Sequence, residues 1–172
     1  SNFRPVKRVG DVIRIFAQVQ KQIPAVLLLV GEGPERLFIQ QLVKDLKLTD
    51  KVFFLGAQDH TEPLFKCADL FLLPSEQESF GLTALEAMSC SVPVIATETG
   101  GLPEVIIHGE IGYLFPIGET GKMADKAVEL LKDPVLYKSF QIKAKQRAVQ
   151  YFNSAQIIQQ YEEYYEEIRN SA

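Results

Sequence analysis

Five short runs of apolar residues recur along this 172-residue chain, and the longer segments between them space their apolar residues as helices do. The runs are residues 25–30, 51–56, 69–74, 92–97 and 112–115. They consist largely of Val, Leu, Ile and Phe, which is typical of strands that are covered on both faces. Regular alternation of such strands with helices predicts an α/β fold with a doubly wound, Rossmann-like parallel sheet.

Helices are expected at residues 6–22, 62–68, 81–88, 121–132, 135–152 and 154–170, and a further helix begins near Pro34. Residues 100–104 contain two adjacent glycines and are expected to form a loop and a turn. The last helix forms a helical C-terminal tail with one broad apolar face. Its residues are Ile157, Ile158, Tyr161, Tyr165 and Ile168. This face either packs on the domain itself or lies against another domain, and it predicts a tendency to self-associate as a homodimer.

The composition is that of an ordinary soluble protein, and 172 residues suit one domain, residues 1–172. The formal net charge of −4 argues against a general nucleic-acid-binding protein. No apolar run is long enough to span a membrane. The two cysteines, Cys67 and Cys90, lack the spacing of metal ligands and are expected to be buried, reduced thiols. We therefore expect a cytoplasmic protein that binds neither nucleic acid nor membrane.

The stretch from Pro74 to Met88 carries the strongest indication of function. A buried strand is followed by a polar loop and then by the first turns of a helix, an arrangement that presents free backbone N–H groups to an anion. Glu78 lies in the loop, and Glu86 lies on the helix among Ala, Leu and Met residues. A carboxylate in such apolar surroundings is costly to bury without partners, so we expect ligand hydroxyl or N–H groups to meet it.

This stretch, E-S-F-G-L-T-A-L-E-A-M with seven residues between its first and last Glu, resembles the family 4 retaining glycosyltransferases, which have the two-domain GT-B fold. The resemblance implies that Glu78 contacts the donor sugar and that Glu86 holds the ribose hydroxyls of the nucleotide. It also implies that the backbone of the helix start meets the sugar and the diphosphate. The residues concerned are Ser79, Phe80, Gly81, Leu82 and Thr83.

Two cations near the start of the chain extend the resemblance. The family places an arginine and a lysine in its first βα loop, where they neutralise the diphosphate, and Lys7 matches the lysine. The usual arginine stands five residues before the lysine, where this chain has Asn2, so Arg4 is the candidate in its place. Both could equally be ordinary surface cations.

Gly31 and Gly33 follow the predicted strand at residues 25–30, in the string G-E-G-P. One interpretation is a tight turn from strand to helix, since the full dinucleotide-binding fingerprint is lacking. In the family resembled, this loop lies close to the nucleotide, so both glycines are also candidate binding residues.

The resemblance covers essentially the whole chain but only the C-terminal, donor-binding half of a GT-B enzyme. It implies a UDP-sugar donor, no metal and no other cofactor, a small-molecule acceptor, and catalysis helped by Glu78, Lys7 and Arg4. It also implies that the N-terminal acceptor domain is absent from this chain, which should therefore bind the donor without transferring sugar. Within the family, the string S-N-F-R-P-V-K-R resembles the branch that attaches N-acetylglucosamine from UDP-N-acetylglucosamine to L-malate in bacillithiol biosynthesis.

Two alternatives remain open at this point. The chain could be the donor domain of another GT-B enzyme, similar to sucrose or glycogen synthases or acting on another acceptor. It could also be a non-catalytic nucleotide-binding βα module, which would show no preference for sugar nucleotides over plain nucleotides.

Overall fold

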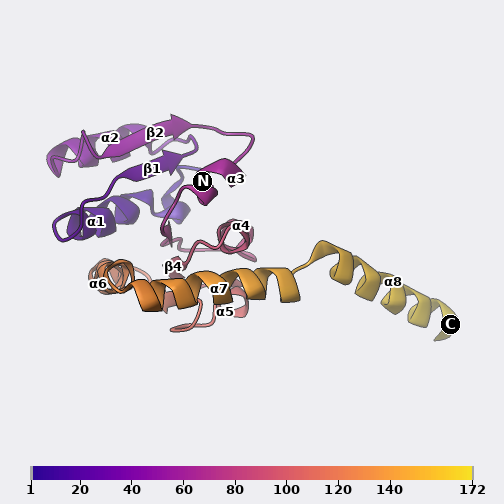
Figure 1. Cartoon of the computed structure of the whole chain (residues 1–172). Helices are drawn as coiled ribbons and strands as arrows, with labels where there is room; N and C mark the ends of the chain where they lie inside the picture. Colours follow the sequence, from indigo (N-terminus) through magenta and orange to yellow (C-terminus); the bar gives the residue numbers. More distant parts are fainter. Residues whose placement is uncertain (1, 172) are drawn as a thin grey trace.

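The computed structural model describes residues 2–171, and their side chains apart from those of residues 154–157, 159–161 and 170–171. Strands and helices alternate along the chain, as the pattern of apolar runs predicts (Figure 1). The strands are β1 (Leu27–Val30), β2 (Val52–Gly56), β3 (Phe71–Leu73), β4 (Val94–Thr97) and β5 (Gly112–Phe115). The α/β class and the five strand positions are therefore confirmed.

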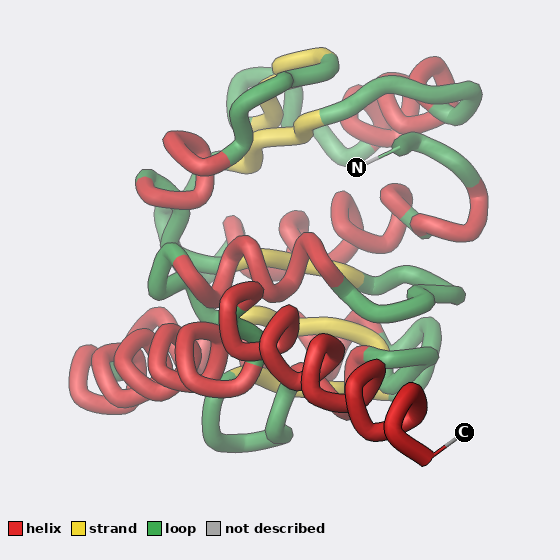
Figure 2. The backbone as a smooth tube through the Cα atoms, turned by 90° about the vertical axis from the view of Figure 1, so that its right-hand side faces the viewer, coloured by secondary structure: helices red, strands yellow, loops and turns green. Residues whose placement is uncertain are grey.

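All strand pairs are parallel, but the strands are divided between two sheets. One sheet has the order β1-β2 and the other has the order β3-β4-β5, and the two lie one above the other (Figure 2). A cavity of about 1120 Å³ lies between them, lined by residues of β1 and β3. Those two strands are not hydrogen-bonded to each other, which is why the expected single sheet is seen as two.

The described part of the chain has eight helices and one short 3-10 helix. They are η1 (Pro5–Lys7), α1 (Val9–Gln20), α2 (Arg36–Asp45), α3 (Glu62–Lys66), α4 (Leu82–Ser89), α5 (Leu102–Val105), α6 (Thr120–Lys132), α7 (Pro134–Tyr151) and α8 (Ser154–Ser171). Helices α4 and α7 pack together, and α1 packs against both α2 and α6.

The alternation of side chains along β4 explains how two helical layers cover the larger sheet. Val94 and Ala96 belong to a buried cluster with residues of α4, α5 and α7. Ile95 between them points to the other face, where its cluster includes residues of α1 and α6. All four β4 residues are buried, as expected for a strand covered on both sides. Its carboxyl end is thus a rigid support for the loops that follow.

The helix expected at residues 6–22 is interrupted near its start, and this part of the prediction is wrong. Residues 5–7 form the 3-10 helix η1, and Arg8 then adopts a left-handed conformation with φ of 47° before α1 begins at Val9. Arg8 Nε donates a hydrogen bond of 2.7 Å to Asp11 Oδ2, and Arg14 Nη1 donates one of 2.9 Å to Asp11 Oδ1. The buried Asp11 carboxylate is thereby paired, and Lys7 is carried on a turn rather than on a long helix.

Three smaller expectations also need correction. The loop and turn expected at residues 100–104 instead include the start of the short helix α5, Leu102–Val105. Cys67 is exposed and Cys90 is half-buried, so neither is a fully buried thiol.

The apolar face of α8 does not pack on the domain itself, so that expectation is wrong. Ile158, Tyr165 and Ile168 on α8 are exposed, and α8 leads away from the body of the fold (Figure 1). Ile157 and Tyr161 lie outside the described side chains.

None of the helices in the described part of the chain is both long enough and apolar enough to cross a membrane.

Candidate functional site

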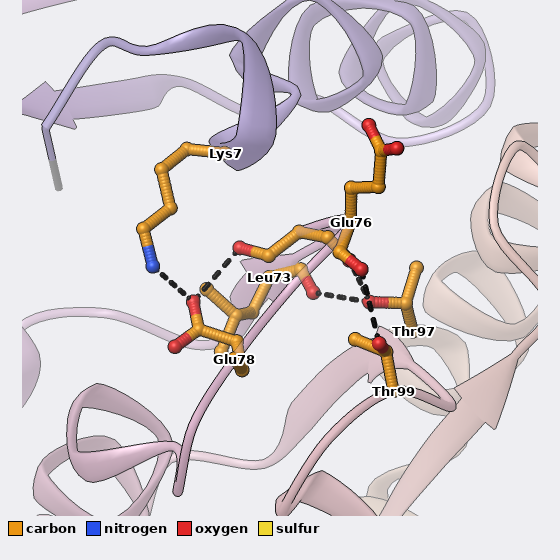
Figure 3. A network of polar contacts seen from close by, with 7 residues as sticks. Lys7, Leu73, Glu76, Glu78, Thr97 and Thr99 are labelled. Carbon is orange, nitrogen blue, oxygen red and sulfur yellow. Dashed lines mark hydrogen bonds and ion pairs between the residues drawn. The ribbon is translucent and has the colours of Figure 1, made fainter.

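The loops after β1, β3 and β4 meet at one edge of the molecule, because parallel strands place their carboxyl ends on the same side. The loop after β3 carries Glu78 and leads into α4. The turn η1 carries Lys7 to the same place, and Figure 3 shows its ammonium group pointing toward the Glu78 carboxylate. Two of the candidate residues from the sequence, Lys7 and Glu78, are therefore brought together.

Lys7 and Glu78 form an ion pair in which Nζ lies 2.6 Å from Oε1. Their side chains are 27% and 13% exposed, so the pair is only partly screened by water. Ser75 Oγ donates a second hydrogen bond, of 2.9 Å, to the same carboxylate oxygen. The other oxygen, Oε2, makes no hydrogen bond to any residue that the structure describes, and it is available to accept one from a ligand.

Hydrogen bonds from backbone and hydroxyl groups hold the loop from Ser75 to Gly81 against the end of β4 and against η1. Thr97 Oγ1 donates a short hydrogen bond to the Ser75 carbonyl, and Thr99 Oγ1 donates one of 3.0 Å to the Glu76 carbonyl (Figure 3). The Glu76 N–H donates to the Val6 carbonyl at 2.7 Å, which ties the loop to η1. These contacts fix the loop that carries Glu78 relative to the turn that carries Lys7.

The two glycines after β4 allow this loop to approach closely. A Cβ atom on Gly100, whose φ is +53°, would lie 1.6 Å from the Glu78 carbonyl oxygen. A Cβ on Gly101 would lie 2.8 Å from Phe80 Cα. The Gly101 N–H donates a hydrogen bond of 3.1 Å to the Glu78 carbonyl. The chain needs glycine here because the backbone after Glu78 passes directly over this turn.

Helix α4 begins beside Glu78 without a side-chain cap. Gly81 stands at the N-cap with φ of 91°, and no side chain accepts a hydrogen bond from the first turn. The first N–H groups of a helix lack partners within the helix, so the start of α4, including Leu82 and Thr83, can donate to an anion. Phe80 is 38% exposed, and its ring meets Phe152 edge to face at 5.8 Å between centroids.

Glu86 differs from the expectation that its charge is buried in apolar surroundings. It is exposed on α4, and no described residue forms an ion pair or side-chain hydrogen bond with its carboxylate. That physical argument for a ligand is therefore wrong, although the carboxylate remains free to bind one. Arg4 is also exposed, at the N-cap of η1, and its guanidinium has no partner among the described residues.

The loop after β1 is bound to the start of the chain. Gly31 has φ of 126°, and its N–H donates a hydrogen bond of 2.7 Å to the Gly56 carbonyl. A Cβ on Gly33 would lie 2.6 Å from the Phe3 carbonyl oxygen. Phe3 donates from its N–H to the Glu32 carbonyl at 2.9 Å. The tight-turn interpretation of the G-E-G-P string is therefore supported by the backbone, and the loop lies beside the segment that leads to Lys7.

Ser75, Thr97 and Thr99 are site residues that the sequence analysis missed. A signal was present, because each hydroxyl residue stands at or just beyond the end of β3 or β4, where strand ends meet. The cavity between the sheets reaches this edge, since Lys7, Pro74 and Thr83 are among its lining residues. No group of three or more His, Cys, Asp or Glu residues that could hold a metal ion occurs among the residues described.

A family model described as "Glycosyl transferases group 1" matches residues 1–147. The chain belongs to the group 1 glycosyltransferases. The curated N-acetyl-alpha-D-glucosaminyl L-malate synthase of Bacillus anthracis is 50% identical to this group 1 domain over 171 residues. The match covers 99% of this chain and 45% of that protein. The chain thus spans under half the length of this relative.

Two solved structures resemble the group 1 domain closely. Anabaena Alr3699/HepE in complex with UDP has a TM-score of 0.90 and 29% identity, covering 97% of this chain and 47% of that one. The C-terminal domain of a group 1 glycosyltransferase, LpcC of Francisella tularensis, has a TM-score of 0.81 and 26% identity. That match covers 89% of this chain and 83% of the LpcC domain. The GT-B architecture expected from the resemblance is therefore confirmed at the level of this domain.

Proposed function

We propose that this chain is the donor-binding domain of a retaining glycosyltransferase that transfers N-acetylglucosamine from UDP-N-acetylglucosamine to L-malate in the cytoplasm. The observation that carries the proposal is the meeting of Lys7 and Glu78, at 2.6 Å, beside the uncapped start of α4. The malate-synthase name of the 50% identical relative supports the choice of substrates, and the UDP complex of the HepE structure supports the nucleotide.

The diphosphate of the donor would bind between Lys7 and the N-terminus of α4. The ammonium group and the free N–H groups of Leu82 and Thr83 offer positive charge and hydrogen-bond donors from two sides. Arg4, exposed and without a described partner, would add a guanidinium that can contact two phosphate oxygens at once. In this proposal the protein's own cations stabilise the departing UDP, and no metal is required.

The two carboxylates would contact two different parts of the donor, the sugar and the ribose. Oε2 of Glu78 is free and would accept a hydrogen bond from a sugar hydroxyl beside the diphosphate. Glu86 lies about one turn into α4, which begins at Leu82, and its exposed carboxylate would accept hydrogen bonds from the ribose hydroxyls. The site would thus hold the sugar, the phosphates and the ribose in line along the first turns of one helix.

Catalysis in this proposal is positioning and electrostatics, without a covalent intermediate on the enzyme. The acceptor would approach the anomeric carbon from a second domain facing Glu78, as the GT-B architecture implies. Holding both substrates in a reactive geometry supplies much of the rate in such reactions. Residues 2–171 would contribute the donor half, so donor binding is the activity to measure on this chain.

A thermal-shift panel of UDP-, GDP- and ADP-sugars tests the proposal. A ligand that binds only the folded state raises the melting temperature in proportion to RT ln(1 + [L]/Kd). We expect UDP-N-acetylglucosamine to produce the largest shift. A larger shift with ADP-glucose or UDP-glucose would indicate a GT-B enzyme similar to glycogen or sucrose synthases. Equal shifts with sugar nucleotides and plain nucleotides would indicate a non-catalytic nucleotide-binding module.

A further inference from the structure

Two fully buried hydroxyl side chains lie beneath the loop that carries Glu78. Among the described residues, three polar or charged side chains are buried, and Ser75 and Thr97 are two of them, each with 0% of its surface exposed. Burying a hydroxyl costs free energy unless it is hydrogen-bonded, and Ala or Val would avoid that cost. Both hydroxyls form a hydrogen bond to a residue of this loop, and Thr97 Oγ1 also lies 3.5 Å from the Leu73 carbonyl at the end of β3. These contacts offset the cost of burial and hold the loop in place.

The hydrogen bonds form a path from β4 to the Glu78 carboxylate. Thr97 Oγ1, at the end of β4, donates to the Ser75 carbonyl and so fixes the backbone of Ser75. Ser75 Oγ donates at 2.9 Å to Glu78 Oε1. Lys7 Nζ reaches the same oxygen at 2.6 Å. Because both donors act on Oε1, the carboxylate is held with Oε2 directed away from them.

We propose that Ser75 is a positioning residue that orients Glu78 toward the donor sugar, and that Thr97 acts by holding Ser75 in place. The inference rests on the proposed function, since it needs a sugar hydroxyl to meet Oε2. Neither side chain touches the ligand in this account. The two residues would instead affect selectivity for the sugar. A carboxylate held in one orientation favours a sugar that has a hydroxyl at the matching position.

The contact from Ser75 matters most when the ligand is bound. The diphosphate attracts the Lys7 ammonium, which must then divide its hydrogen bonds between phosphate and Glu78. The Ser75 hydroxyl is fully buried and has no access to the phosphates, so its hydrogen bond to Oε1 persists. Ser75 thus keeps the carboxylate oriented at the stage at which the sugar is recognised.

The test is calorimetric titration of the folded chain with UDP and with UDP-N-acetylglucosamine. Ser75→Ala should weaken binding of the sugar nucleotide by about tenfold, the effect of one lost hydrogen bond to a charged group, and change UDP binding less than twofold. Thr97→Val should have the same selective effect, and Thr97→Ser, which keeps the hydroxyl, should restore wild-type selectivity. Ser139→Ala on α7 is the matched control and should change neither affinity.

The outcomes separate this inference from the proposed function. The inference is overturned if folded Ser75→Ala binds both ligands with unchanged affinity, or loses the same affinity for both. It is also overturned if Thr97→Val and Thr97→Ser show the same selectivity between the two ligands. If Glu78→Gln loses selectivity while Ser75→Ala keeps it, the proposed function stands and the positioning role is wrong. A wild-type chain that binds neither ligand overturns both. Should Ser75→Ala not fold, the two Thr97 variants decide the result.

Discussion

Lys7 and Glu78 are 71 residues apart in the sequence, and their side chains meet at 2.6 Å. The ion pair joins η1 to the loop after β3, so it connects the first segment of the described chain with the loop that leads into α4. The cation proposed for the diphosphate is thus paired with the carboxylate proposed for the sugar. An incoming anion must therefore share or displace Glu78 as the partner of Lys7.

Glu78→Gln should change the affinities for UDP and for UDP-N-acetylglucosamine to different extents. Removing the carboxylate charge frees Lys7 for phosphate, so UDP should bind up to about fivefold more tightly, the equivalent of about 1 kcal/mol for a partly exposed ion pair. The sugar nucleotide should gain less or lose affinity, because the contact to its sugar is lost. Calorimetry measures both values, and Glu110→Gln at an exposed loop position is the control. A parallel loss of affinity for both ligands would contradict the separate roles.

Lys7→Ala should weaken UDP binding by roughly tenfold or more, as expected for hydrogen bonds to a charged group. UMP carries less phosphate charge and should lose less. The salt dependence of UDP binding should also become shallower, since surface charges are screened by added ions. Titrations at several salt concentrations measure this, with Lys44→Ala on the exposed side of α2 as the control. Normal UDP affinity of Lys7→Ala at low salt would show that the lysine does not contact the diphosphate.

Glu86→Gln should lower UDP affinity by roughly 10- to 100-fold without changing stability. The carboxylate is exposed and has no described side-chain partner, so the free energy of unfolding should change by less than about 0.5 kcal/mol. A loss of affinity in a fully stable variant is the mark of a ligand contact. Glu166→Gln on α8 is a matched, helix-borne control. Retained UDP affinity would exclude Glu86 from the ribose site.

Gly100→Ala should destabilise the fold and the site together. Its φ of +53° already disfavours alanine by about 1–2 kcal/mol, and the new Cβ would lie 1.6 Å from the Glu78 carbonyl oxygen. The loop that carries Glu78 must then move. Gly118→Ala separates the two effects, because Gly118 has φ of +88° with nothing within 4 Å of its Cβ. Denaturant unfolding should show the larger loss for Gly100→Ala, and equal losses would mean that the close approach is unimportant.

The fold was largely predictable from the sequence, because buried parallel strands are nearly pure runs of apolar residues. The run at residues 92–97, for example, contains the fully buried β4. The break at Arg8 was not predictable, since a left-handed conformation is uncommon for a residue other than glycine and here it accompanies the pairing of Arg8 with Asp11.

The site was predictable where local sequence decides it, as in the loop and helix that hold Glu78 and Glu86. It was not predictable where distant residues meet. Thr97 reaches the Ser75 carbonyl across 22 positions, and no local pattern indicates that contact. The exposure of Glu86 could not be predicted, because flanking apolar residues on a helix do not determine which way the residue between them points.

An NMR titration of the ¹⁵N-labelled chain with UDP tests most directly whether this edge binds the nucleotide. The account predicts saturable shifts that are largest for the amides of residues 78–86, followed by those of residues 4–8 and 31–33. A separate groove lies along α7 and is lined by Lys145 and by Ser91, which follows α4; the amides of this α7 groove should stay unchanged. Saturable shifts confined to the α7 groove, or no saturable shifts at residues 78–86, would contradict the account.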